Sequence, residues 1–573
     1  MRLNVPISVG WGRFFTRWDA VAILLVLGLL VFLAEASRHL LQPLTELQQQ
    51  PVSLDPANLP EYAARTTLRM LVAMALSLLF TFTYATLAAR NKHAERLLIP
   101  LLDILQSVPI LGFISITVVF FMALAPGRVL GAEYAAIFAI FTSQAWNMAF
   151  SFYQSLRTVP IELAEASRNF RLSAWMRFWR LDVPFAMPQL IWNMMMSMSG
   201  SWFFVVASEA ISVGNTTITL PGVGSYIALA IEHRDLAAVG YAIITMLIVI
   251  LIYDQLLFRP LVTYADRFRF EQEPGVLPPR SWLLDALRRS RLVDRFTRPF
   301  AASWRRLLLA RPAKDAEPNL PREKPHPWAT VQWTIVLVVA VAATLWQVVG
   351  FVIQDITFAD LAATLLLGLA TLSRIVVLIA IASAIWVPVG VWVGTRSRVA
   401  ELVQPVAQFL AAFPANLLFP IAVSLIVVLK LNPNVWLSPL MILGTQWYIL
   451  FNVVAGAAAI PAELRAASTN LRVSGWLWWR RIAFPAVFPY YVTGAITASG
   501  GSWNASIVAE VASWGDQHLQ AYGLGAYIAQ QTEAGDFHRI VLGIAVMSFF
   551  VVLINRTFWR PLYRYAERKY RLG

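Results

Sequence analysis

The chain contains apolar runs of about 20 residues that recur along its whole length. A helix of that length crosses the hydrocarbon core of a bilayer, where each backbone N–H and C=O must find its partner within the helix. Only 14% of the residues are charged, against about a quarter in soluble domains, and 58% are hydrophobic. The sequence therefore predicts an all-α polytopic membrane protein.

The apolar runs fall into two sets of six. The first set lies near 21–33, 68–89, 97–123, 134–152, 184–210 and 239–258. The second set lies near 333–352, 361–394, 403–428, 435–457, 485–511 and 540–558. An even number of spans per set keeps both sets in one orientation, so we expect twelve transmembrane helices as two parallel repeats. A cleaved signal peptide ending near Ala36 is the alternative interpretation of the first run.

Charge sets the expected orientation and domain boundaries. Lys and Arg exceed Asp and Glu to give a net charge of +14, and they gather in loops and tails beside the apolar runs. Such a distribution indicates topology rather than nucleic-acid binding, with both termini cytoplasmic. We divide the chain into a first repeat (1–260), a cytoplasmic basic linker (261–327) and a second repeat (328–573). The linker could lie partly on the membrane surface or be a disordered tether.

A basic segment between the fourth and fifth runs occurs twice. The copies begin at Glu165 and Ala466 and end at Pro188 and Pro489, with a constant offset of 466 − 165 = 301. Both copies are compatible with a helix, and a pair at equal spacing indicates an internal duplication. First-copy residues that meet an identical residue 301 positions later include Ser167, Asn169, Arg171, Ser173, Trp175, Arg180, Pro184 and Pro188.

This segment resembles the EAA loop of ABC importer permeases, in which Glu-Ala-Ala precedes a glycine and then Ile-x-Leu-Pro. The loops 160–183 and 461–484 keep much of that spacing. The glycine position, however, holds Arg171 and Arg472, and Ala466 stands where the glutamate belongs. A basic amphipathic helix on the membrane surface is the alternative.

The resemblance implies a type I ABC importer permease fold and a docking helix for an ATPase subunit in each loop. The implied docking residues are Glu165, Ala166, Ser167, Asn169, Arg171, Ser173, Trp175, Ala467, Ser468, Asn470, Arg472, Ser474 and Trp476. Two ATPase domains would bind ATP and Mg²⁺, because this chain has no Gly-Lys-Ser/Thr phosphate loop. We expect no cofactor, metal, catalytic residue or nucleic-acid partner here; the chain has no cysteine, and its histidines lack metal-ligand spacing.

A second series follows each loop. Gly200-Ser-Trp202 and Glu209 align with Gly501-Ser-Trp503 and Glu510. The series resembles permeases for nitrate, sulfonates and taurine. It implies import of a small oxyanion (nitrate, sulfonate, taurine or bicarbonate class) across a bacterial inner membrane, from an external or periplasmic substrate-binding protein.

Polar side chains in apolar spans often line a pathway, although they also bond helix to helix. The pathway candidates are Asn193, Ser197, Ser201, Trp202, Glu209, Thr497, Ser502, Trp503, Asn504 and Glu510. Further polar candidates are Gln106, Gln144, Asn147, Gln408, Asn416 and Gln446.

Arg69 and Arg374 are counterparts in the outer part of the second run of each repeat. They could extend to the membrane interface or pair with Glu209 and Glu510. Helix breaks at the prolines 109, 184, 414 and 485 could add positive dipole to an anion pathway.

A twelve-helix secondary transporter also fits two parallel sets of six spans. The paired basic loops favour the ABC importer permease, because a secondary carrier has no use for two matched docking helices.

Overall fold

The structure is a computed structural model that describes residues 52–213, 216–268, 281–289 and 355–570, with isolated positions between 298 and 350. The expected spans 21–33 and 333–352, and most of the linker 261–327, lie outside the described residues. Within the described part, six helices are long and apolar enough to cross a membrane, or eight if two bent helix pairs each count as a span. The chain is thus a multi-pass helical protein.

The first repeat begins with the 3₁₀ turn η2 and ends in the short helix α13. Its elements are η2 (Pro56–Asn58), α3 (Leu59–Arg90), α4 (Lys92–Ser107), α5 (Ile110–Leu124), α6 (Val129–Arg157), α7 (Ile161–Asn169), α8 (Ala174–Arg177), η3 (Phe178–Asp182), α9 (Val183–Glu209), β1 (Ala210–Val213), β2 (Thr216–Thr219), α10 (Val223–Glu232), α11 (Leu236–Tyr253), η4 (Asp254–Phe258), α12 (Arg259–Ala265), η5 (Asp266–Phe268) and α13 (Trp282–Arg289).

The second repeat follows the same order. Its elements are α16 (Phe358–Gly394), α17 (Ser397–Ala412), η7 (Ala415–Leu418), α18 (Phe419–Val428), α19 (Pro433–Trp436), η8 (Ser438–Met441), α20 (Gln446–Ala458), α21 (Ala462–Asn470), α22 (Gly475–Trp478), η9 (Trp479–Ala483), α23 (Phe484–Ala509), β3 (Val511–Trp514), β4 (Gln517–Gln520), α24 (Leu524–Ala534), α25 (Phe537–Ile554), η10 (Asn555–Trp559) and α26 (Arg560–Tyr570). α9 and α23 begin 484 − 183 = 301 residues apart, as the loop repeat predicts.

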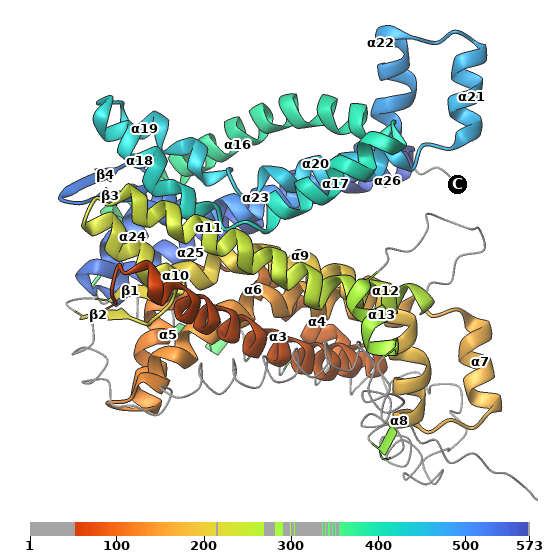
Figure 1. Cartoon of the computed structure of the whole chain (residues 1–573), viewed down its shortest axis with the longest axis horizontal. Helices are drawn as coiled ribbons and strands as arrows, with labels where there is room; N and C mark the ends of the chain where they lie inside the picture. The colour runs from red at the N-terminus through yellow and green to blue at the C-terminus, as the bar shows by residue number, and fades with distance from the viewer. Residues whose placement is uncertain are drawn as a thin grey trace, which may run out of the picture.

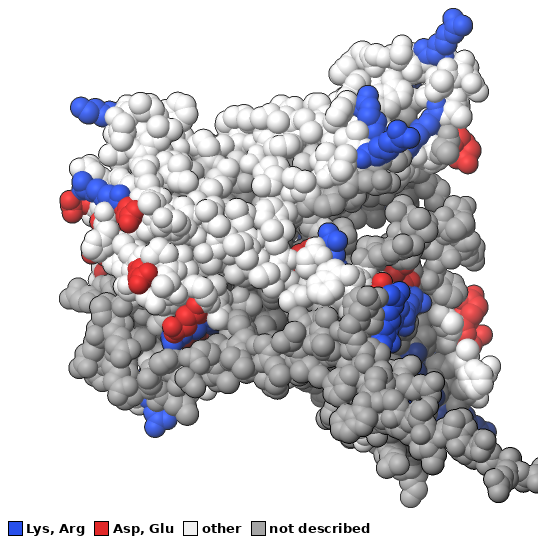
Figure 2. Space-filling view, in the orientation of Figure 1, with Lys and Arg blue, Asp and Glu red and all other residues white. Residues whose placement is uncertain are grey.

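Two bundles lie side by side in Figure 1, with the strands at one end and the pairs α7–α8 and α21–α22 at the other. In each bundle a central helix packs between two long ones: α6 between α3 and α9, and α20 between α16 and α23. On the face shown in Figure 2, the charged side chains gather toward the two ends, and the described surface between them is nearly uncharged. That distribution suits a body whose middle lies in hydrocarbon.

Two expected spans are bent rather than straight. α17 and the η7–α18 segment meet at 82° around Pro414, and the expected fourth span of the second repeat is divided between η8 and α20 at 44°. In the first repeat α4 and α5 are likewise separate helices on either side of Pro109. Proline removes an N–H and clashes with the preceding turn, which explains the breaks at Pro109 and Pro414.

The expected breaks at Pro184 and Pro485 are wrong. The helix continues through both prolines, because a wider π-helical turn, η3 or η9, precedes each one and accommodates its ring. The strands were also not expected. β1 pairs antiparallel with β2, and β3 with β4, as a short hairpin directly after each fifth span.

Each repeat places a broken-helix segment in the core of the other. Phe413 and the fully buried Leu417 pack in the cluster built mainly from the first repeat. Leu111, at the start of α5, packs in the cluster built mainly from the second repeat. The two bundles therefore share their cores, and α9 and α23 contact the broken-helix segments of the opposite repeat.

Candidate functional site

A cavity of about 350 Å³ lies between the two repeats and is lined by residues of both α9 and α23. α9 contributes Ser197, Ser199 and Gly200, and α23 contributes Thr497 and Gly500. The described residues that line it include no Lys, Arg, Asp or Glu. The polar residues that line it therefore carry hydroxyl, amide and indole N–H groups, which can bind a solute without ion pairing.

Four of the ten predicted pathway residues line this cavity: Ser197, Thr497, Trp503 and Asn504. Gln106 and Asn147, which are hydrogen-bonded to each other at 2.6 Å, line it as well. The other six pathway candidates are not among its lining residues: Asn193, Ser201, Trp202, Glu209, Ser502 and Glu510.

The matched serines bond helix to helix instead. The hydroxyl oxygens of Ser201 and Ser143 lie 2.6 Å apart, and those of Ser502 and Thr445 lie 3.1 Å apart. These two bonds tie α9 to α6 and α23 to the segment before α20. The sequence offered both interpretations of these serines, and interhelical bonding is the one that the structure shows.

The remaining candidates contact neighbouring helices or lie away from the cavity. The Asn193 amide donates to the Ser151 hydroxyl at 2.8 Å. Trp202 meets the edge of Tyr253, and its indole ring is almost fully buried. Gln144, Gln408, Asn416 and Gln446 are not among the lining residues of the cavity.

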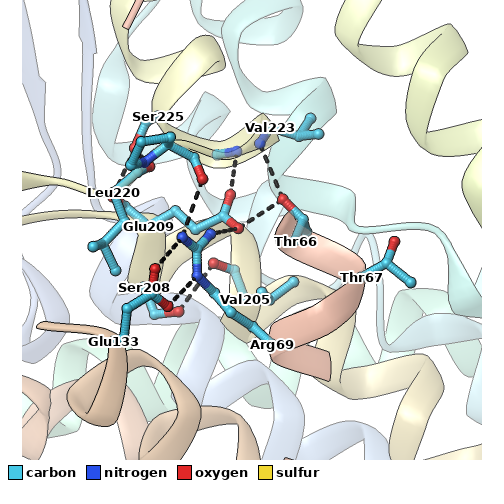
Figure 3. A network of polar contacts seen from close by, with 12 residues as sticks. Thr66, Thr67, Arg69, Glu133, Val205, Ser208, Glu209, Leu220, Val223 and Ser225 are labelled. Atoms are coloured by element: carbon cyan, nitrogen blue, oxygen red, sulfur yellow. Dashed lines mark hydrogen bonds and ion pairs between the residues drawn. The ribbon is translucent and has the colours of Figure 1, made fainter. Parts of the chain in front are cut away.

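Arg69 lies between two carboxylates, as Figure 3 shows. Its Nε donates to Glu133 and its Nη1 to Glu209, each at 2.6 Å, and the arginine side chain is 3% exposed. Glu209 also accepts hydrogen bonds from the Thr66 hydroxyl and the Gly224 N–H. The prediction that Arg69 extends to the interface is wrong, and its pairing with Glu209 is confirmed.

The second repeat has a weaker version of this cluster. Arg374 donates to Glu510 at 3.1 Å, and Thr371 and the Ala526 N–H donate to the same carboxylate. Asn434 stands where Glu133 would fall (434 − 133 = 301), and the arginine side chain is 15% exposed. In both repeats the glutamate fastens the segment after the hairpin to the long second-run helix.

Each docking loop reverses direction through a left-handed arginine. Arg171 has φ +47° and Arg472 φ +50°. The next residue closes the turn: the Leu172 N–H donates to the Ser167 carbonyl at 3.1 Å, and the Val473 N–H to the Ser468 carbonyl at 2.9 Å. This is a helix C-cap in which glycine is usual, which explains the glycine of the EAA pattern.

The predicted docking residues divide into exposed and structural ones. The exposed ones are Glu165, Asn169, Arg171, Ala467, Asn470, Arg472, Ser474 and Trp476, and Ala166 and Trp175 are half-buried. Ser167 and Ser468 are buried and donate to carbonyls of their own helices, while buried Ser173 caps α8. These serines shape the loops rather than present a surface.

Sequence reasoning missed the apolar tips of the loops. Phe170 and Leu471 are 78% and 76% exposed and occupy equivalent positions, 471 − 170 = 301. Ile161, at the start of α7, is similarly exposed. The sequence did contain a signal for them, a large apolar residue beside the turn in both copies. Exposed apolar groups often mark protein contacts.

Ion pairs of Asp182 link the first loop to its bundle, and the second loop lacks a carboxylate at the equivalent position. Buried Asp182 accepts from Arg90 at 2.8 Å and lies 3.5 Å from the Arg177 Nε. The equivalent of Asp182 is Ala483 (483 − 182 = 301), which has no charge.

The family described as binding-protein-dependent transport system inner membrane component matches residues 70–258 and 386–571, more than half of the chain. The chain belongs to this family. It is an ABC importer permease in tandem-duplicated form, since each repeat matches separately. Family membership also excludes the alternative of a secondary transporter. Permeases of this family generally work with ATPase and substrate-binding partners.

Curated relatives of this permease each match about one third of the chain or less. The nitrate import permease protein NrtB of Synechocystis is 26% identical over 35% of this chain and 70% of its own length. The bicarbonate transport system permease protein CmpB of Synechococcus elongatus is 28% identical over 33% of this chain and 64% of its own length. The glycine betaine/proline betaine transport system permease protein ProW of Escherichia coli is 28% identical over 28% of this chain and 42% of its own length.

Proposed function

We propose that this permease forms the translocation pathway for a small oxyanion. An external binding protein delivers the solute, and separate ATPase subunits that bind ATP and Mg²⁺ drive import. The observation that carries the proposal is the uncharged, donor-lined cavity between the matched fifth spans. The nitrate and bicarbonate permeases among its relatives support an anionic solute.

Two ATPase domains would dock on the loops α7–α8 and α21–α22. Both loops project from the same end of the molecule, apart from each other (Figure 1). Each presents an apolar tip, Phe170 or Leu471, beside an exposed arginine. An apolar anchor with charged groups around it is a common arrangement at protein interfaces.

By the positive-inside rule, the basic loops support a cytoplasmic location for that end and for both termini. The hairpins β1–β2 and β3–β4 lie at the opposite end, which would then face the binding protein. The membrane would be the inner membrane of a bacterium.

Isolation of the chain with its native partners tests this assembly. We expect native mass spectrometry to show two ATPase domains per chain, and the chain alone to hydrolyse no ATP. Replacing Phe170 and Leu471 together with serine should release the ATPase subunits. Leu236→Ser, at an exposed leucine near the opposite end, is the matched control. A single ATPase domain per chain would contradict the two-site assembly.

Uptake measurements test the solute class. Cells that express the complete transporter should accumulate an oxyanion such as nitrate, bicarbonate or a sulfonate in an ATP-dependent manner. Accumulation of a cation or a neutral sugar instead would overturn the proposed function.

A further inference from the structure

The tip of the hairpin β3–β4 lies against the end of α10 in the opposite repeat. The Gly515 N–H donates to the Ile231 carbonyl at 3.0 Å, and the Arg234 Nη2 donates to the Asp516 Oδ2 at 2.7 Å. A Cβ added at Gly515 would meet the Arg234 Nε, so the arginine side chain covers the backbone of this glycine. We call the contacts of Gly515 and Asp516 with Ile231 and Arg234 the latch.

The residues beside the ion pair are packed in the shared cores. Trp514 directly precedes the tip, is 8% exposed and belongs to the core cluster of the second repeat. Ile231 packs against this cluster and also against the cluster of the first repeat. The ion pair itself leaves 47% of the Arg234 side chain and 96% of the Asp516 side chain exposed, and an exposed pair contributes little alone. The latch therefore depends on the ion pair, the backbone hydrogen bond and the apolar packing together.

The hairpins begin a short distance beyond the cavity. On α9 the last lining residue is Phe204, 209 − 204 = 5 residues before the helix ends at Glu209. On α23 the last lining residue is Ala505, 509 − 505 = 4 residues before the helix ends at Ala509. At 1.5 Å per residue, the cavity and the hairpins are about 6–8 Å apart along these helices. The latch thus joins the two repeats just beyond the cavity, at the end that the proposed orientation makes external.

The charged part of the latch is present on one side only. With the offset of 301 residues, Asn215 is the counterpart of Asp516 and Gly535 is the counterpart of Arg234. Neither side chain is charged, so the equivalent ion pair cannot form between the hairpin β1–β2 and the end of α24. The underlying contact is nevertheless repeated, because β1 contacts α24 as β3 contacts α10.

We propose that the latch holds the external end of the translocation pathway closed and has to open for a solute to enter. The repeats cannot separate at this end while the Gly515 hydrogen bond and the Arg234–Asp516 ion pair are in place. The direction of entry rests on the proposed function, whereas the latch itself requires only this chain.

A cysteine pair can lock the latch, because the chain has no cysteine of its own. A Cβ on Gly515 would lie 2.8 Å from the Arg234 Cγ. One more bond of about 1.5 Å puts the two Cβ atoms of a cysteine pair within about 4.3 Å, and disulfides need roughly 3.5–4.5 Å. The latch pair is Arg234→Cys with Gly515→Cys. Ile528→Cys with Gly543→Cys is the matched pair inside the second repeat, where an added Cβ would lie 2.7 Å from the Ile528 Cγ1.

Uptake by the complete transporter in proteoliposomes tests whether the latch opens. We expect oxidation of the latch pair to lower uptake at least tenfold, with the ATPase subunits still bound in native mass spectrometry, and dithiothreitol to restore it. The matched pair inside the second repeat should import equally in both forms. The unmodified chain under the same oxidant corrects for cysteines of the partner subunits.

Hydrogen exchange of the purified full-length chain in lipid nanodiscs tests the ion pair without transport. Asp516→Arg places a second cation beside Arg234 and should speed amide exchange in β3–β4 about fivefold. Arg234→Asp combined with Asp516→Arg restores the pair with exchanged charges and should return exchange to the original rate. Glu533→Arg, at an exposed residue of α24, is the control for charge reversal alone.

Two sets of results would overturn the inference. If the oxidised latch pair imports as fast as the reduced one, the latch does not open during import. If no disulfide forms, or if Asp516→Arg leaves exchange in β3–β4 unchanged, the hairpin is not held against α10. A transporter with the unmodified chain that accumulates no oxyanion contradicts the proposed function instead, and the exchange test of the latch is unaffected.

Discussion

Arg171 and Arg472 adopt a backbone conformation that costs a side chain about 1 kcal/mol or more relative to glycine. Arg171→Gly should therefore stabilise the turn between α7 and α8, whereas Arg171→Ala, which also removes the charge, should not. We expect amide hydrogen exchange in α7 to be roughly fivefold slower in the glycine variant than in the alanine variant. Equal exchange in the two variants would show that the arginine conformation is not strained.

The arginine clusters predict unequal consequences for the same substitution. Arg69→Met leaves Glu133 and Glu209 buried without their cation, and breaking a buried pair typically costs about 3–5 kcal/mol. Arg374→Met leaves only Glu510 without its cation, and Glu510 keeps its hydrogen bonds from Thr371 and the Ala526 N–H. The yield of folded protein on size exclusion in detergent should fall sharply for the first variant and modestly for the second. Equal losses would mean that Glu133 adds nothing to the cluster.

At the scale of elements, the sequence predicted what periodicity and spacing encode. The described long helices, the 301-residue offset and the two loops all appear where the apolar runs and the repeat placed them. Bent spans were less predictable. Pro109 and Pro414 break their helices while Pro184 and Pro485 do not, and only the preceding π-helical turn distinguishes them.

The candidate site shows the same limit of prediction. A serine in an apolar helix looks the same in the sequence whether the residue lines a cavity, as Ser197 does, or bonds to a neighbouring helix, as Ser201 does. Rotation about the helix axis decides between them, and distant contacts set that rotation.

We expect the ion pairs of Asp182 with Arg90 and Arg177 to make the loop α7–α8 stiffer than the loop α21–α22. Asp182→Ala would give the first repeat the residue that the second already has. The loss should be about 1 kcal/mol or less, because Arg90 and Arg177 keep 37% and 30% of their side-chain surface exposed. Hydrogen exchange should accelerate in α8, with α22 in the same molecule as the control. Unchanged exchange in α8 would mean that the ion pairs do not hold the loop.

At the scale of the whole molecule, the shared cores make the halves interdependent. The Asn504 side chain of α23 accepts from the first N–H of α5 at 2.7 Å, and Asn416 donates to the Phe203 carbonyl of α9 at 3.1 Å. Together with Phe413 and Leu417 in the opposite core, these contacts cross between repeats.

A cut within residues 269–280 tests this interdependence. Each half expressed alone should accumulate poorly in the membrane, because it lacks core residues that the other half supplies. The two halves expressed together should co-purify and recover most of the intact yield. Stable accumulation of the first half alone would contradict the interdependence of the repeats.

Because the two repeats are parts of one chain, their sequences can differ, and the molecule need not be exactly symmetric. In a homodimer, every side chain near a two-fold axis appears twice, so the two walls of a central passage are copies of each other. Here Ser199 has Gly500 as its counterpart, 301 residues on, and both line the cavity. A cavity with unlike walls offers different contacts on its two sides, so a solute with a head and a tail would bind in it in one preferred orientation.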